Sequence, residues 1–189
     1  MANETRRFSR VEYEKLIDLG VFQPGEAIEL LGGHLMVAEP QGARHYTAIV
    51  KTARALQAAF GAAAYVRMQG PIGLDDDSEP EPDVAVVPGT VDDYGQVHPS
   101  RALLVVEVAE SSLVFDRDSK GSLYARAGVA EYWIVNLIED VVEVYREPRA
   151  DAAAAFGWRY TRKEVFGIAV SIAPGAVPTT HVPVSDIVP

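Results

Sequence analysis

The sequence predicts an α/β fold, of the α+β kind, in which helices and β-strands share one core. Two observations support this class. One stretch, 43–61, repeats apolar residues at helical spacing. Elsewhere PDVAVVP and ALLVVEVA are short, valine-rich runs of the kind buried at the centre of a sheet. The chain of 189 residues is 48% hydrophobic and 23% charged, and it lacks an internal repeat or linker, so we expect a single globular domain, 1–189.

The N-terminal third predicts a helix, a hairpin and a second helix. A capping-box pattern, Ser-x-x-Glu, begins at Ser9 and opens a short helix that Gly20 ends. The segment AIELLGGHLMVAE, hinged at its glycine pair, predicts a β-hairpin. The longer helix that follows presents one apolar stripe, formed by Ile49, Ala53, Leu56 and Phe60, and Gly61 ends it.

The middle of the chain predicts several strands and one further helix. AAYVRMQGPIGL, PDVAVVP and ALLVVEVA are the strands, with the acidic turn DDDSEPEP after the first. A helix is expected to start near Asp116 and to stop at Gly128. EYWIVNL and VVEVYRE then form a second hairpin around Glu139-Asp140. We expect the core to span about 6–147, and 148–189 to add a loop tip, at most minor strands and a peripheral tail.

Charge and composition exclude several classes of protein. The net charge is −10, and residues 71–147 carry 17 acidic against 5 basic side chains, which disfavours a protein that coats nucleic acid. Cysteine is absent, so disulfides, thiolate metal sites and cysteine nucleophiles are excluded. The sequence holds no apolar run of membrane-spanning length and no secretory signal. These features predict a cytoplasmic protein.

Glu107 is the most informative residue, because it interrupts the apolar run LLVVEVA. A lone buried carboxylate costs several kcal/mol unless it is paired, protonated or bound to a metal. An alternative is that Glu107 reaches solvent at the end of its strand or pairs with an arginine.

Asp83 supplies a second carboxylate, directly after Pro82 and before the run VAVV. A Pro-Asp pair can also be simple turn chemistry. If the two strands pair, however, Asp83 and Glu107 lie side by side and repel each other unless a proton or a cation separates them. Oxygen ligands without cysteine favour Mg²⁺ or Mn²⁺ over zinc.

Three further residues complete the candidate site. Lys120 follows Glu107 by 13 residues on the next helix, where its ammonium can meet a phosphate or a metal-bound water. Glu29 is a carboxylate among the apolar residues of the first hairpin, and His45 shares the buried stripe of its helix. For Lys120 the alternative is an ordinary solvated lysine, and for His45 it is a hydrogen-bonded core histidine.

In this order, the motifs resemble those of the bacterial Uma-type family, a group of restriction-endonuclease-like proteins in the PD-(D/E)XK nuclease superfamily. The resemblance covers about residues 6–147, roughly three quarters of the chain. The matching stretches are IELLGGHLM, PDV, LVVEV, DRDSK and YARAGVAEYWIV. The fold that the resemblance implies is a restriction-endonuclease-like core, a central mixed β-sheet flanked by helices.

The resemblance also implies roles for individual residues. Asp83 and Glu107 would bind the metal, with the carbonyl of Val108 as a third ligand, and Glu29 would be the acid ahead of the Pro-Asp strand. Members of the superfamily carry a lysine two residues after the glutamate. In this sequence that position is Ala109, which has no amine. The Uma-type pattern takes its cation from Lys120 instead. Asp116 fits the pattern too, but we favour a role for it as N-cap of the helix that carries Lys120.

Together these features predict a Mg²⁺-dependent endodeoxyribonuclease that hydrolyses DNA by metal-activated water. The catalytic residues would be Asp83, Glu107, Lys120, Glu29 and His45. Two alternatives stay open, an inactive nuclease fold that binds DNA or another partner, and a metal-dependent hydrolase of a smaller phosphoester. Cutting both DNA strands predicts a homodimer. The candidate DNA contacts outside the acidic block are Arg6, Arg7, Arg44, Lys51, Arg54, Arg67 and Arg126.

Overall fold

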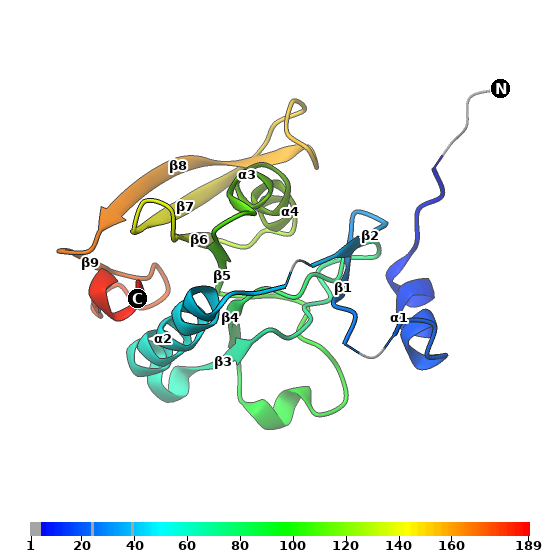
Figure 1. The fold of residues 1–189 in the computed structure, drawn as a ribbon, viewed down its shortest axis with the longest axis horizontal. Helices are drawn as coiled ribbons and strands as arrows, with labels where there is room; N and C mark the ends of the chain where they lie inside the picture. Colours follow the sequence, from blue (N-terminus) through cyan, green and yellow to red (C-terminus); the bar gives the residue numbers. More distant parts are fainter. Residues whose placement is uncertain (1–4, 24, 39) are drawn as a thin grey trace.

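A mixed six-stranded sheet in the order β3-β4-β5-β6-β7-β8 forms the centre of the protein (Figure 1). The computed structural model describes residues 5–23, 25–38 and 40–189. Neighbouring strands are antiparallel except β5 and β6, which are parallel. The strands are β3 (Ala64–Met68), β4 (Val84–Pro88), β5 (Leu104–Ala109), β6 (Glu131–Asn136), β7 (Val141–Ala150) and β8 (Trp158–Gly167).

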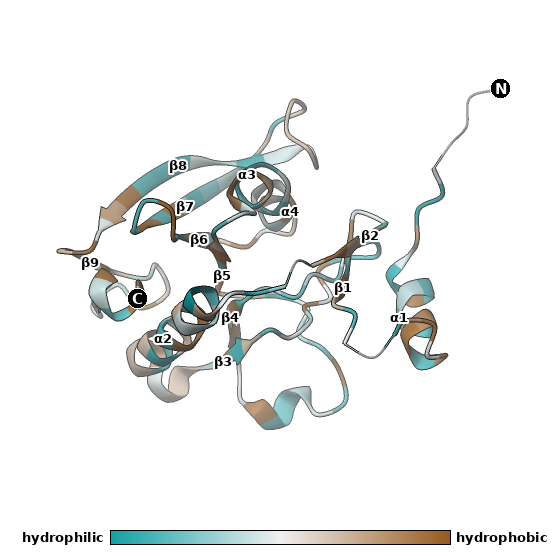
Figure 2. Ribbon diagram, in the orientation of Figure 1, coloured by the Kyte–Doolittle hydropathy of each residue, from teal (hydrophilic) through white to brown (hydrophobic). Residues whose placement is uncertain are grey.

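Helices cover both faces of this sheet, so the predicted α+β class with a helix-flanked mixed sheet is confirmed. On one face α2 (Ala43–Phe60) packs its predicted stripe against alternate valines of β4 and β5. On the other face α4 (Gly121–Arg126) packs Tyr124 against the residues between those valines. In Figure 2 the central strands are brown, as expected for strands that are buried on both sides.

The predicted N-terminal elements are confirmed. Helix α1 (Arg10–Asp18) begins with the capping box of Ser9 and Glu12. Strands β1 (Ile28–Leu31) and β2 (His34–Val37) pair as a hairpin, whose turn holds both Gly32 and Gly33 at positive φ. Leu30 exchanges two main-chain hydrogen bonds with Glu79, which ties β1 to the acidic turn of the sequence.

The helix after β5 starts earlier than predicted. It begins with α3 (Leu113–Phe115), continues through the π-helical turn η3 (Asp116–Lys120) and leads directly into α4. Asp116 therefore has helical backbone angles (φ −66°, ψ −39°), and the prediction that it is the N-cap is wrong. Its carboxylate instead accepts a hydrogen bond of 2.5 Å from the hydroxyl of Ser112. The predicted stop at Gly128 is confirmed by its positive φ of 73°.

The C-terminal part contributes more than predicted. The expectation of at most minor strands there is wrong, because β8 has ten residues and pairs with β7 along most of its length. Beyond it lie β9 (Ser171–Ile172), β10 (Val182–Pro183) and the short helix η4 (Val184–Asp186), next to α2 in Figure 1. Apolar side chains of this tail enter the core that α2 covers: Ile172, Val182, Val184, Ile187 and Val188.

Two short 3₁₀ helices complete the chain, η1 (Gly61–Ala63) after α2 and η2 (Val91–Tyr94) after β4. Among the described residues, none of the helices is both long enough and apolar enough to span a lipid bilayer.

Candidate active site

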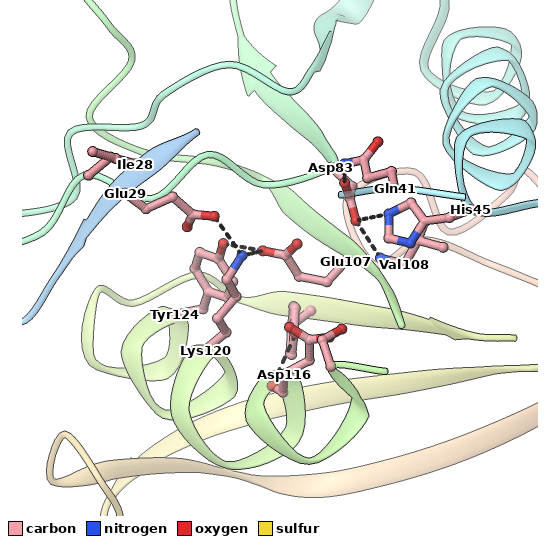
Figure 3. A network of polar contacts seen from close by, with 12 residues as sticks. Ile28, Glu29, Gln41, His45, Asp83, Glu107, Val108, Asp116, Lys120 and Tyr124 are labelled. Carbon is pink, nitrogen blue, oxygen red and sulfur yellow. Dashed lines mark hydrogen bonds and ion pairs between the residues drawn. The ribbon is translucent and has the colours of Figure 1, made fainter. Parts of the chain in front are cut away.

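A pocket of about 380 Å³ opens where β1, the start of β4, the end of β5 and the η3 turn approach one another. Every residue predicted for the site lines this pocket, whichever element carries it. These residues are Glu29, His45, Asp83, Glu107, Val108 and Lys120 (Figure 3). The fold thus brings together side chains that are up to 91 positions apart in the sequence.

The register of β4 and β5 brings Asp83 and Glu107 together. Val84 pairs with Val106, so the antiparallel ladder continues with residue 83 opposite residue 107. One carboxylate oxygen of Asp83, Oδ2, accepts a hydrogen bond of 2.8 Å from the main-chain N–H of Val108. The Asp83 carboxylate is therefore bound to the same strand that carries Glu107.

Two residues, one in the first turn of α2 and one just before it, complete the surroundings of Asp83. Nε2 of His45 lies 3.3 Å from Oδ2 of Asp83, without the geometry of a hydrogen bond. The side-chain amide of Gln41 lies 3.4 Å from the other oxygen, Oδ1. His45 thus contacts an acid of the pocket rather than serving as an ordinary core histidine.

Glu107 is bound from the opposite side by α4 and η3. Its Oε1 accepts hydrogen bonds from Nζ of Lys120 at 3.1 Å and from the hydroxyl of Tyr124 at 2.6 Å. The same ammonium lies 3.2 Å from Oε1 of Glu29 (Figure 3). With 3% of Glu107 and 8% of Lys120 exposed, neither is a solvated surface residue, and the partner of Glu107 is a lysine instead of an arginine.

The π-helical turn explains how Lys120 reaches two acids. In η3 the N–H of Gly121 bonds to the carbonyl of Asp116, five residues back, so the turn is wider than an α-helical turn. Turns of this kind are rare and are frequently found at functional sites. Lys120 ends the π-turn, and Tyr124 follows one helical turn later, so both point at Glu107.

Burial is the largest single influence on the pKa values of Glu107, Lys120 and Asp116 in the pocket. Burial raises the pKa of Glu107 well above its usual value; Lys120 opposes this shift, and neighbouring carboxylates add to it. Burial acts to lower the pKa of Lys120, but the carboxylates of Glu107 and Glu29 outweigh it and raise that pKa above its usual value. Burial also raises the pKa of Asp116 to about 6. The pocket therefore holds more carboxylates than Lys120 balances, and a further cation would be stabilised there.

The oxygen donors of the pocket fit a divalent ion such as Mg²⁺ or Mn²⁺. Asp83, directly before β4, and Glu107, on β5, both line the pocket, and Oε2 of Glu29 is buried without a hydrogen-bond partner among the described residues. Mg²⁺ takes carboxylate and carbonyl oxygens and keeps several of its waters, so two carboxylates and a main-chain oxygen are sufficient. Within the described ranges, no group of three or more His, Asp or Glu side chains is arranged to hold a metal alone. Main-chain and water oxygens would have to complete the coordination.

Sequence reasoning missed several residues of the pocket. Tyr124 binds Glu107 directly, and its spacing of four residues from Lys120 was a usable signal. Glu81 lines the pocket with a pKa raised by burial and by Glu29, but in the sequence it is one acid of the turn DDDSEPEP and does not stand out. Gln41 precedes α2 in a stretch without a sequence pattern, so its contact with Asp83 could not be anticipated.

The candidate DNA-binding cations fall into two groups, those already bound to groups of the protein and those without an ion pair. Arg44 binds the carbonyl of Leu137 and the carboxylate of Asp140, and Arg126 binds two aspartates of the acidic turn. Arg6 pairs with Glu12, and Lys51 donates to main-chain carbonyls of the C-terminal tail. Within the described residues, ion pairs with a carboxylate are lacking for Arg7, Arg54 and Arg67.

Residues 10–175 match the Uma2 family, described as "Putative restriction endonuclease". A similar solved structure is the crystal structure of "a putative nuclease belonging to DUF820" from Anabaena variabilis, with a TM-score of 0.65 and 16% sequence identity. That alignment covers 90% of this chain and 94% of the other. No curated protein matches the sequence.

Proposed function

Because the chain belongs to the Uma2 family of restriction-endonuclease-like proteins, we propose that it is a Mg²⁺-dependent endodeoxyribonuclease. Nucleases of this type generally use divalent metals. One observation carries the proposal: Asp83, directly before β4, and Glu107, on the adjacent antiparallel strand β5, both line the pocket that also contains the ammonium of Lys120.

In this proposal Asp83, Glu107 and the carbonyl of Val108 hold the ion. A bound divalent ion would lower the pKa of a water molecule and offset charge on the phosphate. Asp83 is kept in place by the N–H of Val108 and by His45, so its position does not depend on the ion. Glu107 is kept in place in the same way by Tyr124. Such prior orientation of ligands reduces the cost of assembling the site.

Lys120 supplies the positive charge that the superfamily takes from a lysine on the strand. Its ammonium is 3.1 Å from Oε1 of Glu107, and thus next to a carboxylate proposed to hold the ion. There it would orient the attacking water or offset the charge that develops on the phosphate oxygens. Glu29 is a positioning residue in this scheme, because it holds Lys120 from the side opposite Glu107.

Two broader features belong to the same proposal. We infer a homodimer, since one chain has one such pocket among its described residues and two DNA strands must be cut. A cytoplasmic location is supported by the absence of cysteine from the sequence.

Nicking of supercoiled plasmid in Mg²⁺ tests the proposal. We expect Asp83→Asn and Glu107→Gln to lower the rate by about a hundredfold or more, because each removes a ligand charge while keeping the side-chain shape. Titration calorimetry with Mn²⁺ should show weaker binding in both variants, with little change in thermal stability. The matched control is Glu139→Gln, the same change of charge on the exposed β6–β7 turn.

Full activity of Glu107→Gln would show that the site is wrongly assigned. The substrates distinguish the alternatives. Turnover of a nucleotide monoester, without cleavage of plasmid or oligonucleotide, would show that the protein is a hydrolase of smaller phosphoesters and not a nuclease. Binding of DNA and Mn²⁺ without any turnover would identify an inactive nuclease fold.

A further inference from the structure

A second hollow, of about 220 Å³, lies between the edge strand β3 and the short helix η2. It is separate from the pocket described above and has a different character, since its lining combines aromatic rings with one cation. The lining residues are Tyr65, Arg67, Met68, Gly70, Val91 and Tyr94.

The guanidinium of Arg67 is held in this hollow by packing. It lies over the ring of Tyr94, 5.8 Å from the ring centroid. Tyr94 in turn stacks on Tyr65 and donates a hydrogen bond of 2.5 Å to the carbonyl of Pro88. On another side the guanidinium rests against Gly70, where an added Cβ would be 2.8 Å from Nη2. Arg67 is thus placed in advance, which reduces the entropy lost on binding a ligand.

The charge of Arg67 is not neutralised by an acidic side chain in the described part of the chain. Among the described residues it forms no ion pair with a carboxylate, although the net charge of the protein is −10. Other arginines of the acidic region, Arg117 and Arg146 for example, are bound to buried glutamates. A guanidinium with its hydrogen-bond donors available is suited to a phosphate group, which it can bind through two parallel N–H bonds.

The hollow lies on the same face of the sheet as the candidate active site. Arg67 pairs across the strands with Ala85, and Ala85 and Val105 belong to the cluster under α4. Glu107 is two residues from Val105 and therefore points to that face as well. The end of β3 separates the two sites, because Gln69 lines the first pocket and Met68 and Gly70 line the second.

The distance between the sites also suits a nucleic acid strand. The N–H of Gln69 donates a hydrogen bond of 3.1 Å to the carbonyl of Asp83, so the start of the active site borders the end of β3. Arg67 is two residues before Gln69, so their main chains are at most about 7 Å apart, at about 3.3–3.6 Å per residue. A strand of DNA that crosses the active site can therefore place a neighbouring phosphate over Arg67.

We propose that this hollow is a phosphodiester-binding subsite, in which Arg67 contacts a backbone phosphate next to the one at the active site. The ligand class is a nucleic acid strand, and the inference rests on the proposed nuclease function. Tyr94 and Gly70 position Arg67 without contacting the phosphate themselves.

The salt dependence of DNA binding tests this subsite. Anisotropy of a labelled duplex is measured over a series of NaCl concentrations, with Ca²⁺ as the oxygen-binding divalent ion. Loss of one phosphate contact should reduce the slope of log K against log [salt] by about one. We expect this for Arg67→Ala, with affinity about tenfold lower at moderate salt.

Two further variants separate placement from charge. Gly70→Ala keeps the net charge but displaces the guanidinium of Arg67, so it should weaken binding in the same direction. Arg149→Ala removes an equal charge from an exposed position on β7, and it should leave the slope unchanged. Thermal unfolding of each variant confirms that the fold is retained.

Several outcomes would overturn the subsite. An unchanged slope in Arg67→Ala, or an equal loss in Arg149→Ala, would show that Arg67 makes no specific phosphate contact. An equal loss of affinity for the mononucleotide dTMP would place Arg67 at the active-site phosphate and exclude a separate subsite. The proposed nuclease function is tested separately by plasmid nicking. If the protein binds DNA through Arg67 but does not nick plasmid, the subsite is supported and the nuclease function is contradicted.

Discussion

Lys120 lies between Glu29 and Glu107, and among the described residues it is the cation that pairs with either acid. Its burial would ordinarily favour the neutral amine, but the two carboxylates keep it charged. A buried ion pair adds little stability compared with apolar residues, yet breaking it by removal of one partner costs about 3–5 kcal/mol. Because the pair adds little stability, its presence in the pocket favours a functional role. Separate measurements of activity, metal binding and stability can test this role.

We predict that Lys120→Ala abolishes plasmid cleavage and keeps Mn²⁺ affinity, because Asp83 and Glu107 remain. The variant should also lose about 3 kcal/mol of unfolding free energy in the absence of metal, since two buried acids lose their cation. Mn²⁺ should stabilise the variant by as much as it stabilises the wild type, because its affinity for the folded protein is unchanged. Thermal unfolding with and without Mn²⁺ measures the difference.

The matched control for this variant is Lys15→Ala, which removes an exposed lysine of α1. Cleavage and stability should change little. Unchanged cleavage in Lys120→Ala would remove Lys120 from the mechanism, whatever its effect on stability.

At the scale of elements, Glu143 joins the sheet to the π-turn that carries Lys120. From β7 it accepts hydrogen bonds from Arg117 of η3, from Asn136 of β6 and from Tyr145, and Lys163 of β8 lies 2.8 Å away. Burial opposes the charge of Glu143, but these partners outweigh it and lower its pKa to about 2. The carboxylate therefore stabilises the folded state only while it is ionised.

We predict that Glu143→Gln destabilises the protein most at neutral pH and least in acid. The pKa falls from 4.5 in the unfolded chain to about 2 in the folded protein. The stabilisation, about 3 kcal/mol at 1.36 kcal/mol per unit, is complete above pH 4.5 and is lost as the pH falls toward 2. Urea unfolding of both proteins across this range should show the two stabilities converging. A constant difference at every pH would contradict the assignment.

The C-terminal tail is a second element whose contribution is testable. Ile187 is fully buried against the α2 side of the core, whereas Ile168 is 55% exposed in the turn after β8. We predict that Ile187→Ala costs about 2–4 kcal/mol, from lost burial and the cavity left behind. Ile168→Ala should cost well under 1 kcal/mol. Equal effects of the two variants in urea unfolding would show that the tail does not belong to the core.

For the molecule as a whole, the charge distribution governs how DNA can approach. The net charge is −10, and the pocket contains Glu29, Glu81, Asp83, Glu107, Glu110 and Asp116. These acids repel phosphates until a divalent ion offsets part of their charge. We predict that the affinity for a DNA duplex rises at least about tenfold on addition of Ca²⁺ at constant ionic strength. Equal affinity with EDTA would show that no ion mediates binding.

Most of the fold could be predicted, because local patterns determine it. The capping box at Ser9, the glycine hinge of the first hairpin and the stripe on α2 are all read within a few residues of sequence. The length of β8, predicted as at most a minor strand, could not be anticipated, because its polar, exposed residues give no apolar run and its pairing with β7 depends on a partner elsewhere in the chain.

The site could be predicted in part. Glu107 and Asp83 stand out because a carboxylate beside apolar strand residues is costly. The start of the helix at Leu113 was not predictable from Asp116, since Ser112 and Asp116 are both good N-cap residues. Contacts such as Gln41 with Asp83 depend on how distant segments pack, which no local pattern encodes.

In the proposed function Asp83 and Glu107 share one divalent ion. Anomalous diffraction from crystals soaked in Mn²⁺ can detect this ion. We expect one peak between the two carboxylates, about 2.0–2.3 Å from an oxygen of each and within the same range of the Val108 carbonyl. A map without a peak there, with Lys120 still bound to Glu107 and Asp83 still bound to the Val108 N–H, would contradict it.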